Sequence, residues 1–198
     1  MSSPLQVRKQ KLIHDKIYNA AVDLFDEKGF EATTVDEIAE SAGVSRRSFF
    51  RYFESKDDIL SHTVIAFGKA QVTSIENCPQ ELSVLQVLRG TVSEVLKLLE
   101  DLPSTRKVIS IAQRSPAAKQ AHMSRIIEVE EMIADAYARR MGGTTSKCFT
   151  PCLLAKMTTM IMGASVMAWY SNQFETMQAA ADAVFSQMRC LFAEPDPR

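Results

Sequence analysis

The residues with the clearest chemistry lie in one ten-residue stretch, VSRRSFFRYF, at positions 44–53. Arginine carries a planar guanidinium group, which hydrogen-bonds well to the O6 and N7 acceptors of guanine and to phosphate oxygens. Phe49 and Phe53 are four residues apart, so a helix places both on one face, and we expect that face to be buried. The opposite face is then available to DNA, and it carries Arg46, Arg47, Ser48 and Phe50.

A short helix with a clear start precedes this stretch. Thr34 followed three residues later by Glu37 is a capping box, in which each side chain accepts a hydrogen bond from the other residue's backbone amide. Gly43 interrupts the helix two turns later, and Ser45 is a suitable N-cap for a second short helix. The pattern predicts a helix-turn-helix, a motif whose second helix enters the major groove of DNA.

The distribution of charge is uneven along the chain. The net charge is −1, so binding to nucleic acid must depend on local charge. Residues 44–56 hold three arginines and one lysine but a single acid, Glu54. A second cationic cluster, Arg8, Lys9 and Lys11, lies at the start of the first predicted helix. Two interpretations of it stay open: a solvated helix start, or an arm that reaches phosphates or the minor groove.

Apolar residues recur at helical spacing along almost the whole chain, with few breakers, which predicts an all-α fold. The first helix is expected over about Val7 to Lys28, and one is expected to run unbroken from about Ala117 to Met141. Ser104 and Ser115 are expected to be helix caps. We place a helix-turn-helix DNA-binding domain in residues 1–55 and a second helical domain in residues 56–198.

The stretch GFEATTVDEIAESAGVSRRSFFRYFESKDDIL resembles the DNA-binding segment of the TetR family of bacterial transcriptional regulators. The resemblance is specific over roughly residues 10–62, where TTVDEIA, AGVS and YFESKDDIL follow in the family's order and spacing. It implies about nine helices, three for DNA binding and six for a regulatory and dimerisation domain. It also implies a homodimer. The expected function is that of a repressor on a palindromic operator of double-stranded DNA, released by a small lipophilic inducer.

The resemblance also implies roles for individual residues. Arg47 and Phe50 match the positions nearest the bases. Tyrosine is common in the family where this chain has Phe50, so one possible phosphate hydrogen bond is lost. The positions that contact phosphate correspond to Thr34, Ser45, Arg46, Ser48, Tyr52 and Lys56. For Arg51, a DNA contact and a structural salt bridge both stay open.

Methionines are frequent after residue 120, and their flexible side chains suit an adaptable ligand pocket. The candidate ligand contacts are Met160, Trp169, Tyr170 and Phe174. Plain core filling is the alternative for the methionines, and packing in the core or at a dimer interface explains the three aromatic residues equally well. Small residues such as Gly163 allow helices to approach closely, and two helices from each subunit are expected to form a four-helix dimer interface.

The sequence contains no nucleophile–base arrangement, glycine-rich phosphate loop or metal-ligand spacing, so we expect no enzyme, cofactor or metal site. The four scattered cysteines are expected to be reduced. Lys156 and hydroxyl residues interrupt the most apolar stretch, residues 153–170. This disfavours a membrane span and favours a soluble cytoplasmic protein, associated with the nucleoid when it binds DNA. The main alternative is a DNA-binding regulator controlled by a partner protein or by cysteine oxidation.

Overall fold

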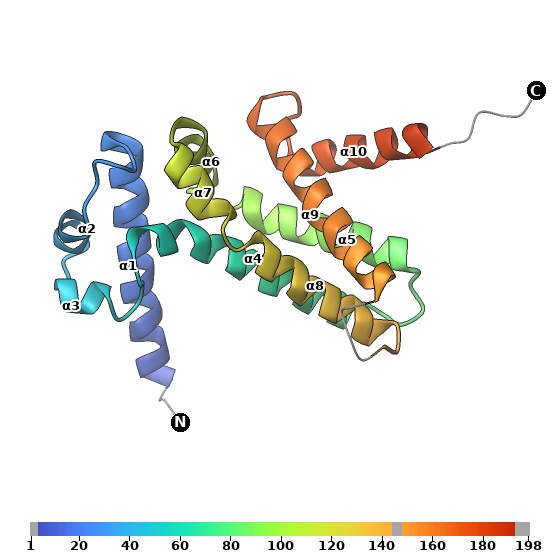
Figure 1. Cartoon of the computed structure of the whole chain (residues 1–198), viewed down its shortest axis with the longest axis horizontal. Coiled ribbons are helices and arrows are strands. Elements are labelled where there is room, and N and C mark those ends of the chain that lie inside the picture. Colours follow the sequence, from blue (N-terminus) through green and yellow to red (C-terminus); the bar gives the residue numbers. More distant parts are fainter. Residues whose placement is uncertain (1–3, 144–147, 193–198) are drawn as a thin grey trace, which may run out of the picture. The chain divides into compact units, whose positions relative to one another are not determined.

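A computed structural model describes residues 4–143 and 148–192, and these residues contain ten α-helices and no β-strand. The all-α prediction is therefore confirmed. The helices are α1 (Pro4–Lys28), α2 (Val35–Ser41), α3 (Arg46–Phe49), α4 (Lys56–Asn77), α5 (Val84–Glu100), α6 (Thr105–Arg114), α7 (Pro116–Met123), α8 (Ile126–Arg140), α9 (Phe149–Tyr170) and α10 (Met177–Phe192) (Figure 1).

The chain packs as two compact units. The first lies within residues 1–65 and 104–126, and the second within residues 66–103 and 127–198. Helices α6 and α7 therefore pack with the DNA-binding segment, although they follow it by fifty residues or more. The predicted boundary after residue 55 marks the end of the DNA-binding motif, whereas each of these two units groups the segments whose backbones lie close together.

The core of the first unit forms between α1, the short helices α2 and α3, and the pair α6 and α7. Ile17 and Phe25 of α1 are almost fully buried, as are Ile38 of α2 and Phe49 of α3. The same core contains Val108, Ile111, Ala118 and Ala121 from α6 and α7. Because full burial of a large apolar side chain contributes roughly 1.5–3 kcal/mol, the helix-turn-helix depends on α6 and α7 for part of its stability.

Ion pairs connect α1 to α6 at the rim of this core. The ammonium group of Lys107 donates to Asp23 Oδ1 at 2.6 Å. Arg114, at the end of α6, pairs with Asp26. Because solvent screens these exposed charges, the pairs contribute little net stability and mainly fix how α6 lies on α1.

One predicted helix is divided in two. The sequence predicts an unbroken helix over residues 117–141, but α7 ends at Met123 and α8 begins at Ile126. The hydroxyl of Ser124 donates to the Ala121 carbonyl at 2.7 Å, a local bond that competes with the helical hydrogen-bond ladder. This division accounts for a tenth helix where about nine were predicted.

The two predicted serine caps have different outcomes. Ser115 caps α7, because its Oγ accepts a hydrogen bond from the Ala118 amide at 3.0 Å, and Pro116 takes the first helical position. The prediction for Ser104 is wrong, since its side chain makes no capping hydrogen bond. Its backbone is already helical, with φ −79° and ψ −12°, whereas a capping residue is usually extended.

The second unit has a core made largely by α5, α9 and α10. Leu96 of α5, Trp169 of α9 and Ala180 of α10 are buried. On α8, Tyr137 is fully buried with its hydroxyl 3.3 Å from Thr158 Oγ1, and burial raises the pKa of this phenol to about 12. The phenol therefore stays neutral and takes part in a buried hydrogen bond.

Among the described residues, α9 is the one helix long and apolar enough to cross a membrane by length and composition alone. Core helices of water-soluble proteins meet the same criterion. In this chain α9 buries Leu154 and Ile161, and its Lys156 donates to Glu130 Oε2 of α8 at 2.6 Å. These contacts make α9 a packing helix of the second unit.

Candidate DNA-binding site

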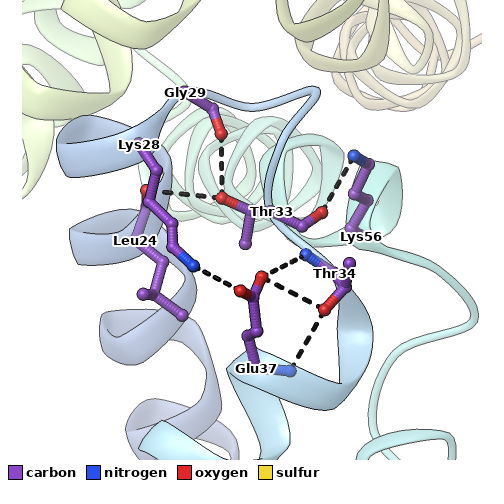
Figure 2. A network of polar contacts seen from close by, with 7 residues as sticks. All are labelled: Leu24, Lys28, Gly29, Thr33, Thr34, Glu37 and Lys56. Carbon is purple, nitrogen blue, oxygen red and sulfur yellow. Dashed lines mark hydrogen bonds and ion pairs between the residues drawn. The ribbon is translucent and has the colours of Figure 1, made fainter.

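Helix α2 begins with the predicted capping box. Thr34 Oγ1 accepts from the Glu37 amide at 3.3 Å, and Glu37 Oε2 accepts from the Thr34 amide at 2.9 Å. Lys28, the last residue of α1, also pairs with Glu37 (Figure 2). The hydrogen bond from Lys28, followed by the one from the Thr34 backbone, lowers the pKa of Glu37 to about 2. The Glu37 carboxylate therefore ties the start of α2 to the end of α1.

The loop before α2 is held by a buried threonine. The hydroxyl of Thr33 lies 2.8 Å from the Gly29 carbonyl oxygen and 3.3 Å from that of Leu24, and it is the donor in both contacts (Figure 2). Thr33 is absent from the predicted site residues. Two consecutive threonines before a helix start are the signal that could have found it, because only the second is needed as the cap.

Lys56, at the start of α4, points its ammonium group at the same loop. Its Nζ donates to the carbonyl oxygens of Phe30 (2.7 Å), Glu31 (3.1 Å) and Thr33 (3.1 Å). Figure 2 shows the bond to Thr33. An ammonium group has three protons to donate, and here each has an acceptor within the protein. In the free chain Lys56 therefore braces α4 against the loop between α1 and α2.

The turn between α2 and α3 requires a glycine. Gly43 has φ 66°, a left-handed conformation that costs glycine little. The next amide, that of Val44, donates to the Ala39 carbonyl at 2.9 Å and closes the end of α2. Ser45 Oγ then accepts from the Ser48 amide at 3.1 Å and starts α3. Helix α3 ends at Phe49, after a single turn, and the chain continues in turns.

The aromatic residues of α3 and the following turn separate by face, as predicted. Phe49 and Phe53 are 0% and 1% exposed, and their ring centroids lie 6.0 Å apart. Phe50, between them, is 47% exposed, and its ring meets that of Phe49 edge-on with centroids 5.3 Å apart. The buried rings fix the orientation of α3 and hold Phe50 at the surface.

The three arginines of this stretch have different surroundings. Arg46 Nη1 donates to both carboxylate oxygens of Asp36, at 2.7 and 2.6 Å. Arg51 lies over the ring of Tyr52, 5.0 Å from its centroid, and Nη2 donates to its hydroxyl at 3.2 Å. Arg47 is exposed and has no ion pair or side-chain hydrogen bond within the described residues. Arg47 is therefore the arginine whose donors are available to a ligand.

The other predicted phosphate contacts differ in exposure. Thr34 and Ser45 are exposed, and both are N-caps of short helices. Ser48 and Tyr52 are half-buried. Tyr52 also packs against the core of the first unit, so its ring is a structural element as well as a candidate contact.

The four candidate ligand contacts do not lie on one face. Trp169 is buried and Tyr170 and Phe174 are half-buried, but Met160 is 55% exposed. Met160 precedes Trp169 by nine residues, which is two and a half helical turns and places the two side chains on opposite sides of α9. The structure therefore does not bring Met160 together with the aromatic residues.

Together, these elements define a class of protein. A capped α2, a left-handed glycine turn, and a short α3 with a buried aromatic face and an exposed arginine are the parts of a DNA-binding helix-turn-helix.

Comparison with known proteins agrees with this class. Residues 17–63 match the family described as bacterial regulatory proteins of the tetR family, and residues 82–193 match the MftR C-terminal domain. The HTH-type transcriptional regulator TcmR of Streptomyces glaucescens is 27% identical over 201 residues, which cover 96% of this chain and 89% of TcmR.

Two solved structures share the fold. A TetR-family transcriptional regulator from Syntrophomonas wolfei superposes with a TM-score of 0.66 at 21% identity, over 91% of this chain and 95% of that one. NalD, the secondary repressor of the MexAB-OprM multidrug efflux pump in Pseudomonas aeruginosa, superposes with a TM-score of 0.61 at 17% identity, with the same coverage.

The chain belongs to the TetR family of bacterial transcriptional regulators. The first match contains both helices of the motif, and the second contains α5 to α10. The protein is a DNA-binding transcriptional regulator and not an enzyme. Proteins of this family are soluble and cytoplasmic, bind DNA, and form dimers.

Proposed function

We propose that this protein is a repressor that binds a palindromic operator as a homodimer and leaves it when a small lipophilic ligand binds. The DNA-binding part of this proposal rests on one observation: α3 and the turn after it have a buried aromatic face and an exposed face. Phe49 and Phe53 are buried, while Arg47 and Phe50 are exposed. Arg47 has the fork of donors that recognises guanine, and Phe50 offers an apolar edge to a thymine methyl group.

The other predicted contacts would position the helix-turn-helix on the sugar-phosphate backbone of DNA. Thr34, Ser45, Ser48 and Tyr52 have hydroxyl groups that can donate to phosphate oxygens. Arg46 is paired with Asp36 in the free chain, so its use on DNA requires exchange of a carboxylate for a phosphate. Lys56 donates to three carbonyl groups in the free chain, so its use on DNA requires exchange of at least one of them for a phosphate oxygen.

The exposed face of α9 supports the homodimer. Leu153, Met160 and Met167 are 44%, 55% and 39% exposed and are spaced seven residues apart. Seven residues are close to two helical turns, so the three side chains form one apolar stripe. Gly163, also exposed, leaves room for a second helix beside the stripe. A dimer is needed because one short helix reads few bases, and two-fold symmetry doubles them on a palindrome.

A ligand would release the protein from DNA through thermodynamic linkage between the two binding equilibria. A ligand lowers affinity for DNA only if it binds better to the conformation that does not fit the operator. Trp169, Tyr170 and Phe174 are the proposed apolar contacts for such a molecule. NalD is described as a repressor of an efflux pump, and it shares this fold.

The test of DNA recognition begins with duplexes selected by the wild-type protein from a random-sequence library. The double variant Arg47→Ala, Phe50→Ala is then compared with Lys97→Ala, Leu98→Ala on α5. The control pair is matched, because Phe50 and Leu98 are both 47% exposed and each neighbours a cation. Loss of one bidentate base contact should cost about 1–3 kcal/mol, or roughly 5- to 150-fold in affinity. Equal binding by the two double variants would contradict the proposed recognition helix.

Control by a ligand is tested separately from control by oxidation. Cys148 and Cys190 are exposed and free, and they are the groups through which peroxide would act. We expect lipophilic compounds to raise the melting temperature and release the selected duplex. Release by peroxide alone, abolished in a Cys148→Ser, Cys190→Ser variant, would favour the alternative of a redox-controlled regulator.

A further inference from the structure

An acidic residue lies beside the arginines of the helix proposed to read bases. Asp36, in the first turn of α2, is exposed, and its two carboxylate oxygens accept from Arg46 Nη1 at 2.7 and 2.6 Å. Arg46 is the first residue of α3. An acid close to a duplex repels its phosphates and lowers affinity for every sequence. The place of Asp36 therefore indicates a role other than attraction to DNA.

The same arginine contacts the aromatic residue proposed to read a base. Its guanidinium carbon lies 5.5 Å from the centroid of the Phe50 ring, four residues later in the chain. A cation over an aromatic ring is attracted to the ring's negative face. The Phe50 ring also meets that of Phe49 edge-on, with centroids 5.3 Å apart. Phe50 is thus held by two neighbours, and one of them, Arg46, is itself held by Asp36.

Arg46 has two alternative uses on a duplex, and Asp36 favours one of them. If Arg46 leaves Asp36 for a phosphate, it gains a contact that is the same in every sequence. If it stays, it keeps the Phe50 ring in place for a thymine methyl group, which only some sequences offer. The hydrogen bonds to Asp36 oppose the first use on all DNA. Asp36 therefore lowers sequence-independent affinity and preserves a sequence-dependent contact.

We propose that Asp36 is a specificity-determining residue, which keeps Arg46 over the ring of Phe50 and away from phosphates, so that the operator is favoured over other DNA. This inference rests on the proposed function of α3. Asp36 acts through Arg46, so it is a positioning residue that does not itself read a base.

Binding of Asp36→Asn to two duplexes tests the inference. The control is Glu40→Gln, which removes the same charge from an exposed acid one turn further along α2. Fluorescence anisotropy gives the affinity for the selected duplex and for a random-sequence duplex between about 50 and 200 mM salt, the range over which phosphate contacts change affinity strongly. Both substitutions are repeated in an Arg46→Gln background, where Asp36 has no guanidinium group to hold. Circular dichroism checks that all variants keep the helix content of the wild type.

We expect Asp36→Asn to bind the random-sequence duplex more tightly than Glu40→Gln does. Its slope of log K against log salt should be steeper by about 0.9, because Arg46 then contacts one more phosphate. The ratio of the affinities for the selected and random-sequence duplexes should fall about two- to fivefold, the contribution of an exposed cation–π contact. In the Arg46→Gln background the two substitutions should have equal effects.

Uracil in place of each thymine of the selected duplex removes one methyl group and tests the link to Phe50. At the thymine that Phe50 contacts, the wild type should lose affinity, and Asp36→Asn should lose less. Equal effects of Asp36→Asn and Glu40→Gln on both duplexes and on the salt slope would overturn the inference alone, with the Arg47→Ala, Phe50→Ala variant still deficient in binding. Full binding by that double variant would instead overturn the proposed recognition helix and this inference with it.

Discussion

Two exposed surfaces of this chain differ in composition and therefore in the partner they fit. The surface of α3 combines Arg47, which has no partner among the described residues, with one exposed ring, Phe50. The surface of α9 is a stripe of Leu153, Met160 and Met167. The first suits a polyanion that is read by hydrogen bonds. The second suits an apolar partner of the same shape, such as the α9 of a second subunit.

The buried layers beneath these surfaces differ as well. Below α3 lie the rings of Phe49 and Phe53, which hold a helix too short to be stable alone. Helix α9 is 22 residues long and packs along much of its length, with Leu154, Ile161 and Trp169 buried. The base-reading surface therefore depends on its aromatic support. The α9 surface can tolerate changes on its exposed side without loss of the fold.

The largest expected effect comes from removing that aromatic support. Phe49→Ala should lower the free energy of unfolding by about 3–5 kcal/mol, because it leaves a cavity under α3. The neighbouring Phe50→Ala should change it by no more than about 0.5 kcal/mol, as is usual for surface substitutions, while still weakening binding to the selected duplex. Urea unfolding monitored by circular dichroism measures both. Equal destabilisation by the two variants would show that the faces of α3 are not separated as described.

A smaller effect is expected on α9, where the change should affect assembly and spare the fold. Met160→Glu places a charge in the middle of the proposed dimer interface, and we expect dimer dissociation to become at least about tenfold more favourable, or 1.4 kcal/mol. Leu98→Glu, at a similarly exposed position on α5, is the matched control. Light scattering over a dilution series gives the dimer dissociation constants. An unchanged dimer in the Met160 variant would exclude this stripe from the interface.

The smallest expected effect concerns the pH dependence of stability, to which Glu37 at the start of α2 contributes. The pKa of Glu37 is lowered from 4.5 to about 2, so its carboxylate stabilises the fold above about pH 4.5 and loses this contribution as the pH falls toward 2. Glu37→Gln should remove this part of the pH dependence. Melting temperatures measured between pH 2 and 6 test it, with Glu40→Gln on the same helix as the control. A Glu37 variant with the pH profile of the wild type would contradict the coupling to Lys28.

The helix-turn-helix could be predicted because its signals are local. The capping box of Thr34 and Glu37 spans four residues, Gly43 marks its own turn, and Phe49 and Phe53 are one helical turn apart. Each of these patterns acts through neighbouring backbone atoms.

The environments of individual side chains could not be predicted in the same way. Lys56 matches a phosphate-contacting position by sequence, yet in the structure it donates to carbonyl groups 23 to 26 residues away. Met160 and Trp169 belong to one apolar helix, yet only Trp169 is buried. A helical pattern alone does not establish which neighbouring elements a side chain meets.

The sequence by itself determined the all-α fold, the helix-turn-helix and its two faces, and the chemistry of Arg47, because these follow from periodicity, caps and residue type. Only the tertiary structure decided that α6 and α7 complete the core of the DNA-binding unit, and that Arg46 and Lys56 have partners within the protein. Those contacts join residues far apart in the chain, such as Asp23 and Lys107. They arise from long-range packing, which leaves no short-range pattern in the sequence.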